Sequence, residues 1–330
     1  MPTLAPQIIG HRGAPGYRPE HTRSSYELAF HMGVDAVEPD VVVTSDGVLV
    51  VRHENEVSTT TDVASRPEFA ARRTTKRIDG HRVTGWFTED FTWDELSRLR
   101  CRERLPTLRP GNTAYDGAEP ILRLRDVLDL AAAAGGGVVV EIKHATYFAG
   151  LGWDLAQLVA DELRRAGWAD GIRPLVIESF ESTVLGQVRE RGIVAPSVYL
   201  LESRGRPADL VAARGASAPD FASVVTPAGL DALPAGVGGI SLDKAMLLGR
   251  HGAGKRGGAE IVADAHERGL VVFTWTCRPE NAFLSRTFRS REGDAAYGDY
   301  VGEWARLQGT GVDGVFVDHP DLGAAQFRRV

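Results

Sequence analysis

The chain has 330 residues, of which 43% are hydrophobic and 25% are charged, and its formal net charge is −6. This balance is typical of a folded globular protein and excludes disorder, collagen and coiled coil. The mildly acidic charge also argues against a nucleic-acid-binding protein, which would carry a basic surface. A chain of this length buries a large core without needing disulfides or a structural metal.

The amino terminus, MPTLAPQIIGHRG, has no basic region followed by a long apolar run, and no stretch reaches membrane-spanning length. We therefore expect no integral membrane segment and a cytoplasmic location for the chain as it stands, or a secreted or periplasmic one if a signal peptide was removed. Cys101 and Cys277 do not make a disulfide framework, which leaves one disulfide between them open. The sequence leaves the oligomeric state open as well.

Short apolar runs alternate with helical patterns along most of the chain. The runs are apolar enough to be parallel strands buried on both faces. They are Ile8–Gly10, Ala36–Val43, Val138–Ile142, Pro174–Ile177, Ser197–Leu201, Gly239–Leu242, Leu270–Trp275 and Gly314–Val317. The expected helices include Glu20–Met32 with Thr22 as its cap, Leu151–Ala166, Glu181–Arg191 and Ala259–Arg268. Eight strands with intervening helices predict a (β/α)₈ TIM barrel, and a doubly wound open sheet is the alternative.

Two regions interrupt this alternation. Asp46-Gly47 lies between two strand-like runs and predicts a tight hairpin. Residues 54–137 are too many for an ordinary barrel loop, and they contain polar sequence and a helical piece at Trp93–Arg102. We expect residues 1–330 to form one barrel domain, in which 54–137 is an insertion after the second strand that caps the substrate entrance.

Charged residues two positions apart occur at two of the predicted strands. One strand carries two carboxylates, and the other ends with a carboxylate and a lysine. Glu38 and Asp40 are two residues apart on a strand, so both point to one face, which in a barrel is the interior. Glu141 and Lys143 repeat this spacing on the next strand. Three inward carboxylates suit one hard divalent cation, Ca²⁺ or Mg²⁺. The alternative is a set of salt bridges to inward Arg or Lys side chains, with Lys143 as one partner.

Two histidines lie at the ends of neighbouring runs, His11 in GHRG and His53 in VVRHE. A lone histidine is usually structural, but two beside a carboxylate cluster suit proton transfer near neutral pH. Arg12 offers a planar fork for a phosphate, or pairs with a barrel carboxylate. The other histidines, His21 among them, are expected to be structural or on the surface.

Taken together, the segments GHRGAPGYRPEHT, AVEPDVVVTSDGVLVVRHE, VEIK, TWT and VDGVFVDHP resemble the glycerophosphodiester phosphodiesterases. Their order and spacing are similar over nearly the whole chain, from Ile8 through Pro320, and the combined pattern is highly specific. The resemblance implies a (β/α)₈ barrel enzyme of glycerophospholipid catabolism. It implies metal-dependent hydrolysis of a small-molecule glycerophosphodiester to glycerol 3-phosphate and an alcohol.

The resemblance also implies roles for individual positions. His11 and His53 match the two catalytic histidines of the family, and Glu38, Asp40 and Glu141 match its ligands for one Ca²⁺ or Mg²⁺ ion. One histidine would deprotonate the nucleophile while the other protonates the leaving alkoxide. The sequence does not decide which histidine is the acid and which is the base. It also leaves open whether the nucleophile is water or the 2-hydroxyl of the substrate.

Four further positions match residues around the phosphate and the substrate. Arg12 and Lys143 match phosphate contacts, and Glu20 matches an acidic residue close to the site. Trp275 matches an aromatic at the barrel mouth that packs against substrate, although a place in the barrel core is an equal alternative.

The chain departs from the family pattern at two positions. His21 replaces a common Asn, and Glu54 replaces the common Asp after the second catalytic histidine. We expect these changes to affect substrate preference more than activity. Two other functions stay open: a phospholipase D-like or lysophospholipid hydrolase, which would need an exposed apolar lip, and a non-catalytic binding protein.

Overall fold

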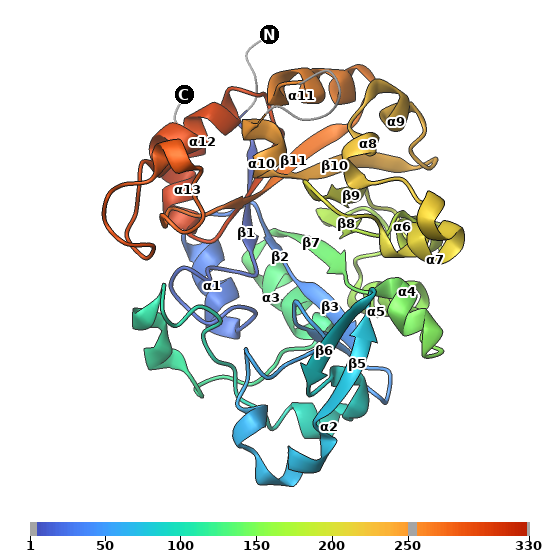
Figure 1. Ribbon diagram of the computed structural model, residues 1–330. Coiled ribbons are helices and arrows are strands. Elements are labelled where there is room, and N and C mark those ends of the chain that lie inside the picture. The colour runs from blue at the N-terminus through green and yellow to red at the C-terminus, as the bar shows by residue number, and fades with distance from the viewer. Residues whose placement is uncertain (1–4, 250–255, 329–330) are drawn as a thin grey trace.

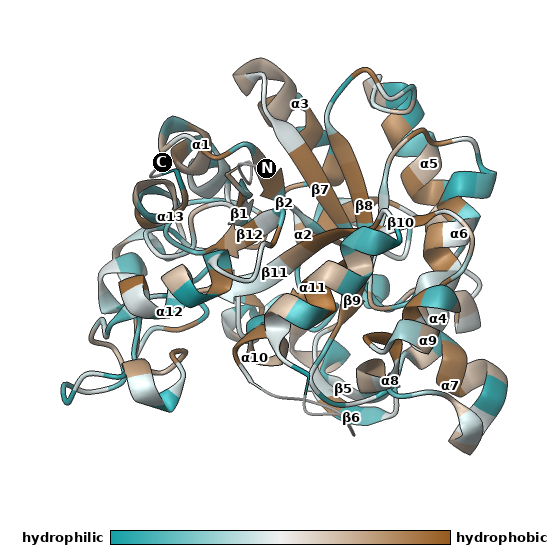
Figure 2. Ribbon diagram, turned by 90° about the horizontal axis from the view of Figure 1, so that it is seen from above, coloured by the Kyte–Doolittle hydropathy of each residue, from teal (hydrophilic) through white to brown (hydrophobic). Residues whose placement is uncertain are grey.

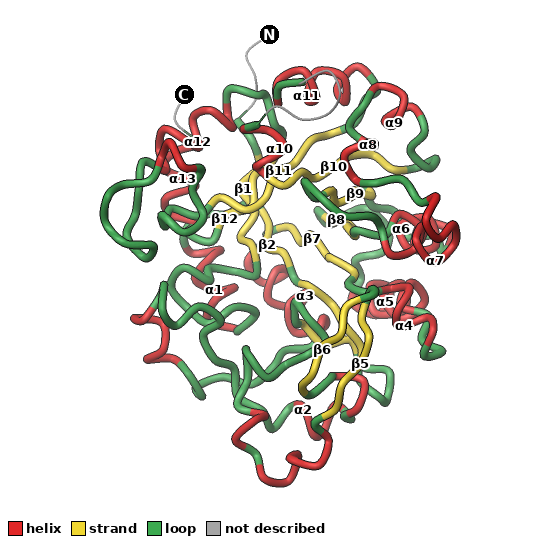
Figure 3. Tube along the Cα trace, viewed as in Figure 1, coloured by secondary structure: helices red, strands yellow, loops and turns green. Residues whose placement is uncertain are grey.

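A closed barrel of eight parallel strands occupies the centre of the molecule, and helices surround it (Figure 1, Figure 3). The computed structural model describes residues 5–249 and 256–328. The barrel strands are β1 (Gln7–His11), β2 (Ala36–Glu38) continued by β3 (Asp40–Val43), β7 (Gly137–Ile142), β8 (Leu175–Ser179), β9 (Ser197–Leu201), β10 (Val237–Asp243), β11 (Val271–Cys277) and β12 (Gly314–Val317). Because β1 pairs with both β2 and β12, and β2 pairs with β7, the sheet closes on itself. The predicted TIM barrel is confirmed, and the open-sheet alternative is wrong.

The second barrel strand is divided at Pro39. The sequence predicts one strand over Ala36–Val43, whereas the structure has β2 and β3 on either side of the proline. Proline has no amide hydrogen to donate to a strand ladder. Its carbonyl still accepts a hydrogen bond from the Glu141 amide at 3.0 Å, so the chain continues in the same direction along β7.

Helices cover the outer face of the barrel. The longer ones are α1 (Arg23–His31), α3 (Leu124–Ala134), α5 (Leu155–Ala166), α6 (Ser182–Glu190), α11 (Gly258–Glu267), α12 (Tyr300–Gln308) and α13 (Pro320–Phe327). The shorter ones on the barrel are α4 (Ala145–Gly150), α7 (Ala208–Arg214), α8 (Phe221–Val224), α9 (Pro227–Asp231) and α10 (Lys244–Leu248). Figure 2 shows strands β7 and β8 as hydrophobic along most of their length, whereas the surrounding helices mix hydrophilic and hydrophobic residues. This is the pattern of a sheet buried between a barrel interior and a helical layer.

Side-chain caps set where several helices begin. Thr22 caps α1, as predicted, and accepts a hydrogen bond from the Ser25 amide. The helix expected over Leu151–Ala166 begins only at Leu155, because the Asp154 carboxylate caps that turn. The helix expected over Trp93–Arg102 is the short α2 (Trp93–Leu96). The amides of Arg100 and Cys101 bond to Asp62 and Glu119 instead, so the chain after α2 turns away.

The inside of the barrel changes character along the strands. Its centre is a small apolar cluster of Ile9, Val139, Val198, Phe273 and Phe316, with Ala36, Val176 and Trp275 packed against it. Side chains two residues further along a strand point to the same face. The next inward positions are therefore those of His11, Glu38, Glu141 and Glu178. The apolar cluster therefore lies beneath a charged layer at the carboxyl ends of the strands.

A hairpin precedes the insertion after the second barrel strand. β4 (Leu49–Val51) runs antiparallel to β3 through the predicted Asp46-Gly47 turn, where Gly47 has a φ of +81°. A second hairpin follows, made of β5 (Thr74–Ile78) and β6 (His81–Gly85). The far end of the predicted 54–137 stretch is α3, which packs in the outer helical ring. The departure from the barrel pattern thus ends before Leu124.

Neither cysteine forms a disulfide. Cys101 and Cys277 are both free and fully buried, and burial raises the pKa of the Cys277 thiol to about 12. In the described part of the chain, no helix combines the length and the apolar character needed to cross a membrane.

Candidate active site

Charged side chains gather at the carboxyl ends of the barrel strands, immediately beyond the apolar cluster. Strand register brings them to one level: His11 is the partner of Glu38, Asp40 of Glu141, and Glu141 of Glu178. Partners on neighbouring strands are only about 5 Å apart, so four carboxylates and one imidazole share a small volume. All of these except Asp40 line a cavity of about 640 Å³.

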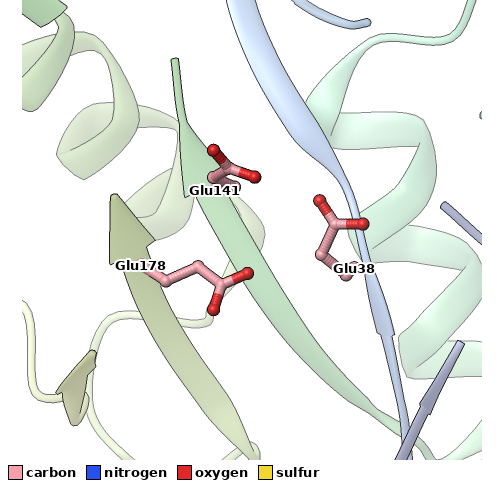
Figure 4. Close-up of side chains that lie close together, drawn as sticks. All are labelled: Glu38, Glu141 and Glu178. Carbon is pink, nitrogen blue, oxygen red and sulfur yellow. The ribbon is translucent and has the colours of Figure 1, made fainter. Parts of the chain in front are cut away.

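Three glutamates from three strands face one another. Glu38, Glu141 and Glu178 each offer a carboxylate oxygen within 4.8 Å of the others, and all three are buried (Figure 4). Glu38 Oε1 and Glu178 Oε2 are buried without a hydrogen-bond partner. Burial, followed by repulsion from neighbouring carboxylates, raises the pKa of Glu38 and of Glu178 well above the usual range. An arrangement of this kind calls for a cation or for protons between the carboxylates.

Asp40 lies at the edge of this group and serves partly as an ion-pair partner. Its Oδ2 is 2.9 Å from His21 Nε2 and 3.2 Å from Arg12 Nε, and its Oδ1 is 3.7 Å from Lys143 Nζ. Oδ1 has no hydrogen bond. Burial alone would raise the pKa of Asp40, but the charges of His53, Lys143 and Arg12 outweigh it and lower that pKa well below its usual value. The salt bridges predicted as the alternative are therefore present at Asp40, and its Oδ1 is the oxygen that has no hydrogen bond.

His11 is held by an aspartate from the last strand end. Its Nδ1 is 2.7 Å from Asp318 Oδ1, and both residues are buried. The carboxylate fixes the ring with Nδ1 protonated, which leaves Nε2 as the free nitrogen. Burial, with a smaller contribution from Arg12, lowers the pKa of His11 to about 4.

His53 follows β4 by two residues and has a matching partner. Its Nδ1 is 2.5 Å from Glu54 Oε1, and 29% of its side chain is exposed to the cavity. Loss of hydration, followed by the charges of Arg12 and Lys143, lowers the pKa of His53 to about 3. Glu54, the residue that follows His53 in the chain, therefore supports the ring directly.

Arg12 and Lys143, the two residues predicted to contact phosphate, both line the cavity. Arg12 donates from Nη1 to Glu20 Oε2 at 3.1 Å, and its Nε is buried without a hydrogen bond. Lys143 Nζ donates to Glu141 Oε1 at 2.6 Å. Glu20 lies behind Arg12 rather than in the cavity lining.

Trp275 lies between the barrel interior and the cavity. Its ring is partly exposed, lines the cavity and meets Phe180 edge to face at a centroid distance of 5.6 Å. Its Nε1 donates to the Ser241 carbonyl at 3.3 Å, which fixes the ring. The two alternatives for Trp275, barrel core and cavity wall, therefore both describe part of the residue.

Two residues of this cluster, Glu178 and Asp318, were not predicted from the sequence. Glu178 comes directly after the last residue of an expected strand, and its place two residues after the inward Val176 was the available signal. His21, which was expected to be structural or on the surface, is a buried structural residue whose Nδ1 is bonded to Tyr26 and whose Nε2 is bonded to Asp40. Asp318 lies within VDGVFVDHP, one of the family segments, but no local pattern linked it to His11.

A barrel with acidic and histidine side chains at the carboxyl ends of its strands defines an enzyme of the TIM-barrel class, since such enzymes carry their active sites at this end. The profile of the glycerophosphoryl diester phosphodiesterase family matches residues 11–322 of the chain. The chain therefore belongs to this family and is an enzyme of the glycerophosphodiester phosphodiesterase type.

Individual relatives agree with the family match. The chain is 30% identical to glycerophosphodiester phosphodiesterase GDPD6 of Arabidopsis thaliana, over 96% of this chain and 85% of the relative. It is 29% identical to a glycerophosphodiester phosphodiesterase of Treponema pallidum, over 55% of this chain and 52% of the relative. The chain thus spans only about half the length of this second relative.

Solved structures share the fold. A putative glycerophosphoryl diester phosphodiesterase of Silicibacter pomeroyi superposes with a TM-score of 0.68 at 23% identity, covering 99% of this chain and 94% of the other. A phosphodiesterase of Oleispira antarctica, in complex with the product sn-glycerol-3-phosphate, superposes with a TM-score of 0.66 at 19% identity, covering 98% of each chain.

Proposed function

We propose that this enzyme hydrolyses glycerophosphodiesters to glycerol 3-phosphate and an alcohol, with a divalent cation bound and with His11 and His53 as the acid–base pair. The observation that carries the proposal is the pair of imidazoles. Each lines the cavity and is bonded through Nδ1 to a carboxylate, beside a cluster of buried acids. The glycerol 3-phosphate bound to the Oleispira antarctica phosphodiesterase supports the substrate class.

The acidic cluster fits a hard divalent cation. Glu38, Asp40 and Glu178 each have a buried carboxylate oxygen without a hydrogen-bond partner, and Glu141 lies between them. We propose that Glu38, Asp40 and Glu141 hold one Ca²⁺ or Mg²⁺ ion, with Glu178 as a fourth carboxylate. Such an ion, when bound, neutralises negative charge on a phosphate oxygen.

The remaining steps belong to the side chains of this chain. Arg12 and Lys143, which both line the cavity, would bind the non-bridging phosphate oxygens. The free Nε2 of one histidine would take the proton of the nucleophile, and the other histidine would donate a proton to the leaving alkoxide. The nucleophile is water or the glycerol 2-hydroxyl of the substrate, and the cyclic phosphate formed in the second case would distinguish the two.

The function is tested by product release. Purified protein is incubated with a panel of glycerophosphodiesters that carry choline, ethanolamine, inositol or glycerol, and glycerol 3-phosphate is measured enzymatically. We expect release that EDTA abolishes and that added Ca²⁺ or Mg²⁺ restores, and the panel then ranks the head groups. Folded, metal-loaded protein that releases no glycerol 3-phosphate from any member would contradict the proposal.

Replacing Trp275 tests whether the aromatic wall contacts substrate. Trp275→Leu removes the ring that lies edge to face against Phe180 at the cavity wall, so we expect KM to rise about 3- to 10-fold with a smaller change in kcat, as for a lost apolar contact. Trp275→Phe keeps an aromatic face and should stay closer to the wild type. Unchanged kcat and KM together with a lower melting temperature would place Trp275 in the core instead.

The two other candidate functions gain no support. A lipid hydrolase would need an apolar lip around the cavity. In the described part of the chain, the large apolar side chains that are exposed are Tyr115, Leu151, Ile172, Val194, Val211, Val271, Tyr297 and Val301. None of them lines the cavity. A purely binding role would leave the paired histidines without a purpose.

A further inference from the structure

One segment of the insertion, residues 103–109, lies against the rear of both histidine sites. Its two arginines, Arg104 and Arg109, line a small recess behind the cavity together with His11 and Asp318. The segment is irregular but tied down, since Glu103 Oε1 accepts from the Leu105 amide at 2.8 Å and the Arg109 amide bonds to the Leu105 carbonyl at 2.8 Å. The arginines therefore come from a fixed turn and not from a free loop.

Arg104 reaches the carboxylate that supports His53. Its Nη1 and Nη2 donate to Glu54 Oε1 and Oε2 at 3.0 and 2.6 Å, and the same Glu54 Oε1 is bonded to His53 Nδ1. On its other side Arg104 donates from Nε and Nη2 to both oxygens of Glu20 at 2.6 Å. Glu20 in turn accepts from Arg12. One guanidinium thus bridges the supports of His53 and of Arg12.

Arg109 makes the corresponding contact for His11. Its Nη2 donates to Asp318 Oδ2 at 2.6 Å, while Asp318 Oδ1 is bonded to His11 Nδ1. Nε donates to Glu280 Oε1 at 2.7 Å and Nη1 to the Pro15 carbonyl at 2.9 Å, so the fully buried guanidinium is used on three sides. The planar fork of arginine suits such fixed, multiple contacts better than the single charge of lysine.

We infer that residues 103–109 form a positioning element for catalysis: Arg104 orients His53 through Glu54, and Arg109 orients His11 through Asp318. The inference rests on the proposed acid–base roles of the two histidines. Both free Nε2 atoms must face the same phosphate, and a small misplacement of a catalytic group is costly in rate. The insertion therefore holds the two histidines in place from the side away from the cavity.

Arg104 is the better arginine for the test, because 21% of its side chain is exposed, whereas Arg109 is buried and shares Asp318 with Arg278, which donates to the same carboxylate at 2.7 Å. We expect Arg104→Met to lower kcat/KM for glycerophosphodiesters by about 10- to 100-fold, as lost supporting contacts commonly do. Arg104→Lys should retain more activity. The matched control is Arg102→Met, since Arg102 is exposed in the same part of the chain and should change kcat/KM less than twofold.

A double-variant cycle separates positioning from a structural role. If Arg104 acts on His53, Arg104→Met should lower kcat much less in a His53→Ala background than in the wild type. If Arg104→Met melts below the assay temperature, Glu54→Gln replaces it, because this variant keeps the contact between Arg104 and Glu20. Its effect on kcat is then compared in the wild-type and His53→Ala backgrounds. An undiminished effect of Arg104→Met without His53, or wild-type kcat/KM in Arg104→Met, would overturn the inference.

The proposed function and this inference fail in different ways. If the wild-type enzyme releases no glycerol 3-phosphate, the function itself is wrong. If the wild type is active and melting curves of the variants match it, the cycle decides on the positioning role alone. Arg109→Lys keeps one positive charge between Asp318 and Glu280. It should lower kcat in the wild-type background and have little further effect on kcat in the His11→Ala background.

Discussion

Replacing either His11 or His53 with alanine is expected to lower kcat by about 10²- to 10⁴-fold, the contribution of one well-placed proton transfer. Both rings line the cavity, and each is held through Nδ1 by a carboxylate, so we expect Nε2 to be the nitrogen that faces substrate. The measurement is the steady-state rate of glycerol 3-phosphate release at saturating concentrations of cation and substrate. Melting curves are recorded for each variant. The matched control is His31→Ala, because His31 is exposed at the end of α1.

The same variants assign acid and base. A substrate whose leaving group is 4-nitrophenol departs without protonation, so the variant that lacks the general acid should recover much of its rate on that substrate. The variant that lacks the general base should remain slow on both substrates. Turnover that survives in both single variants on the natural substrates would contradict the two-histidine mechanism.

The level of the barrel at which the site lies could be predicted from the sequence. Strand periodicity of two places Glu38 and Asp40 on one face, and parallel register then aligns them with Glu141. Glu178 was not predicted as a site residue, because the expected strand ended at the last apolar residue, Ile177, whereas β8 continues to Ser179. When a strand carries a functional carboxylate near its end, the hydropathy pattern underestimates its length, because the apolar run stops before the carboxylate.

The supports of the site could not be predicted in the same way. Arg104 and Glu20 are 84 residues apart, and Arg109 and Asp318 are 209 apart. Periodicity describes regular elements, but it carries no information on which distant carboxylate an irregular segment meets. Glu54 was assigned to substrate preference for the same reason, because its contact with Arg104 exists only in the folded chain.

Glu178→Gln is expected to have opposite effects on the metal-free protein and on cation binding. Glu178 has no hydrogen bond or ion pair among the described residues, and its neighbours Glu38 and Glu141 repel it. Removing its charge with an isosteric amide relieves buried repulsion, so the melting temperature in EDTA should stay equal or rise. The cation loses one carboxylate, so its affinity should fall at least about tenfold, or about 1.4 kcal/mol.

Calorimetric melting curves with Ca²⁺ or Mg²⁺ added measure both effects. A cation at 100 times its dissociation constant stabilises the wild type by about 2.7 kcal/mol, and a tenfold weaker site under the same conditions gains only about 1.4 kcal/mol. Glu202→Gln is the matched control, because Glu202 lines the same cavity outside the glutamate cluster and should leave the cation-induced shift unchanged. A Glu178→Gln variant that melts lower in EDTA, yet keeps the full cation-induced shift, would show instead that Glu178 is structural and that the ion is held without it.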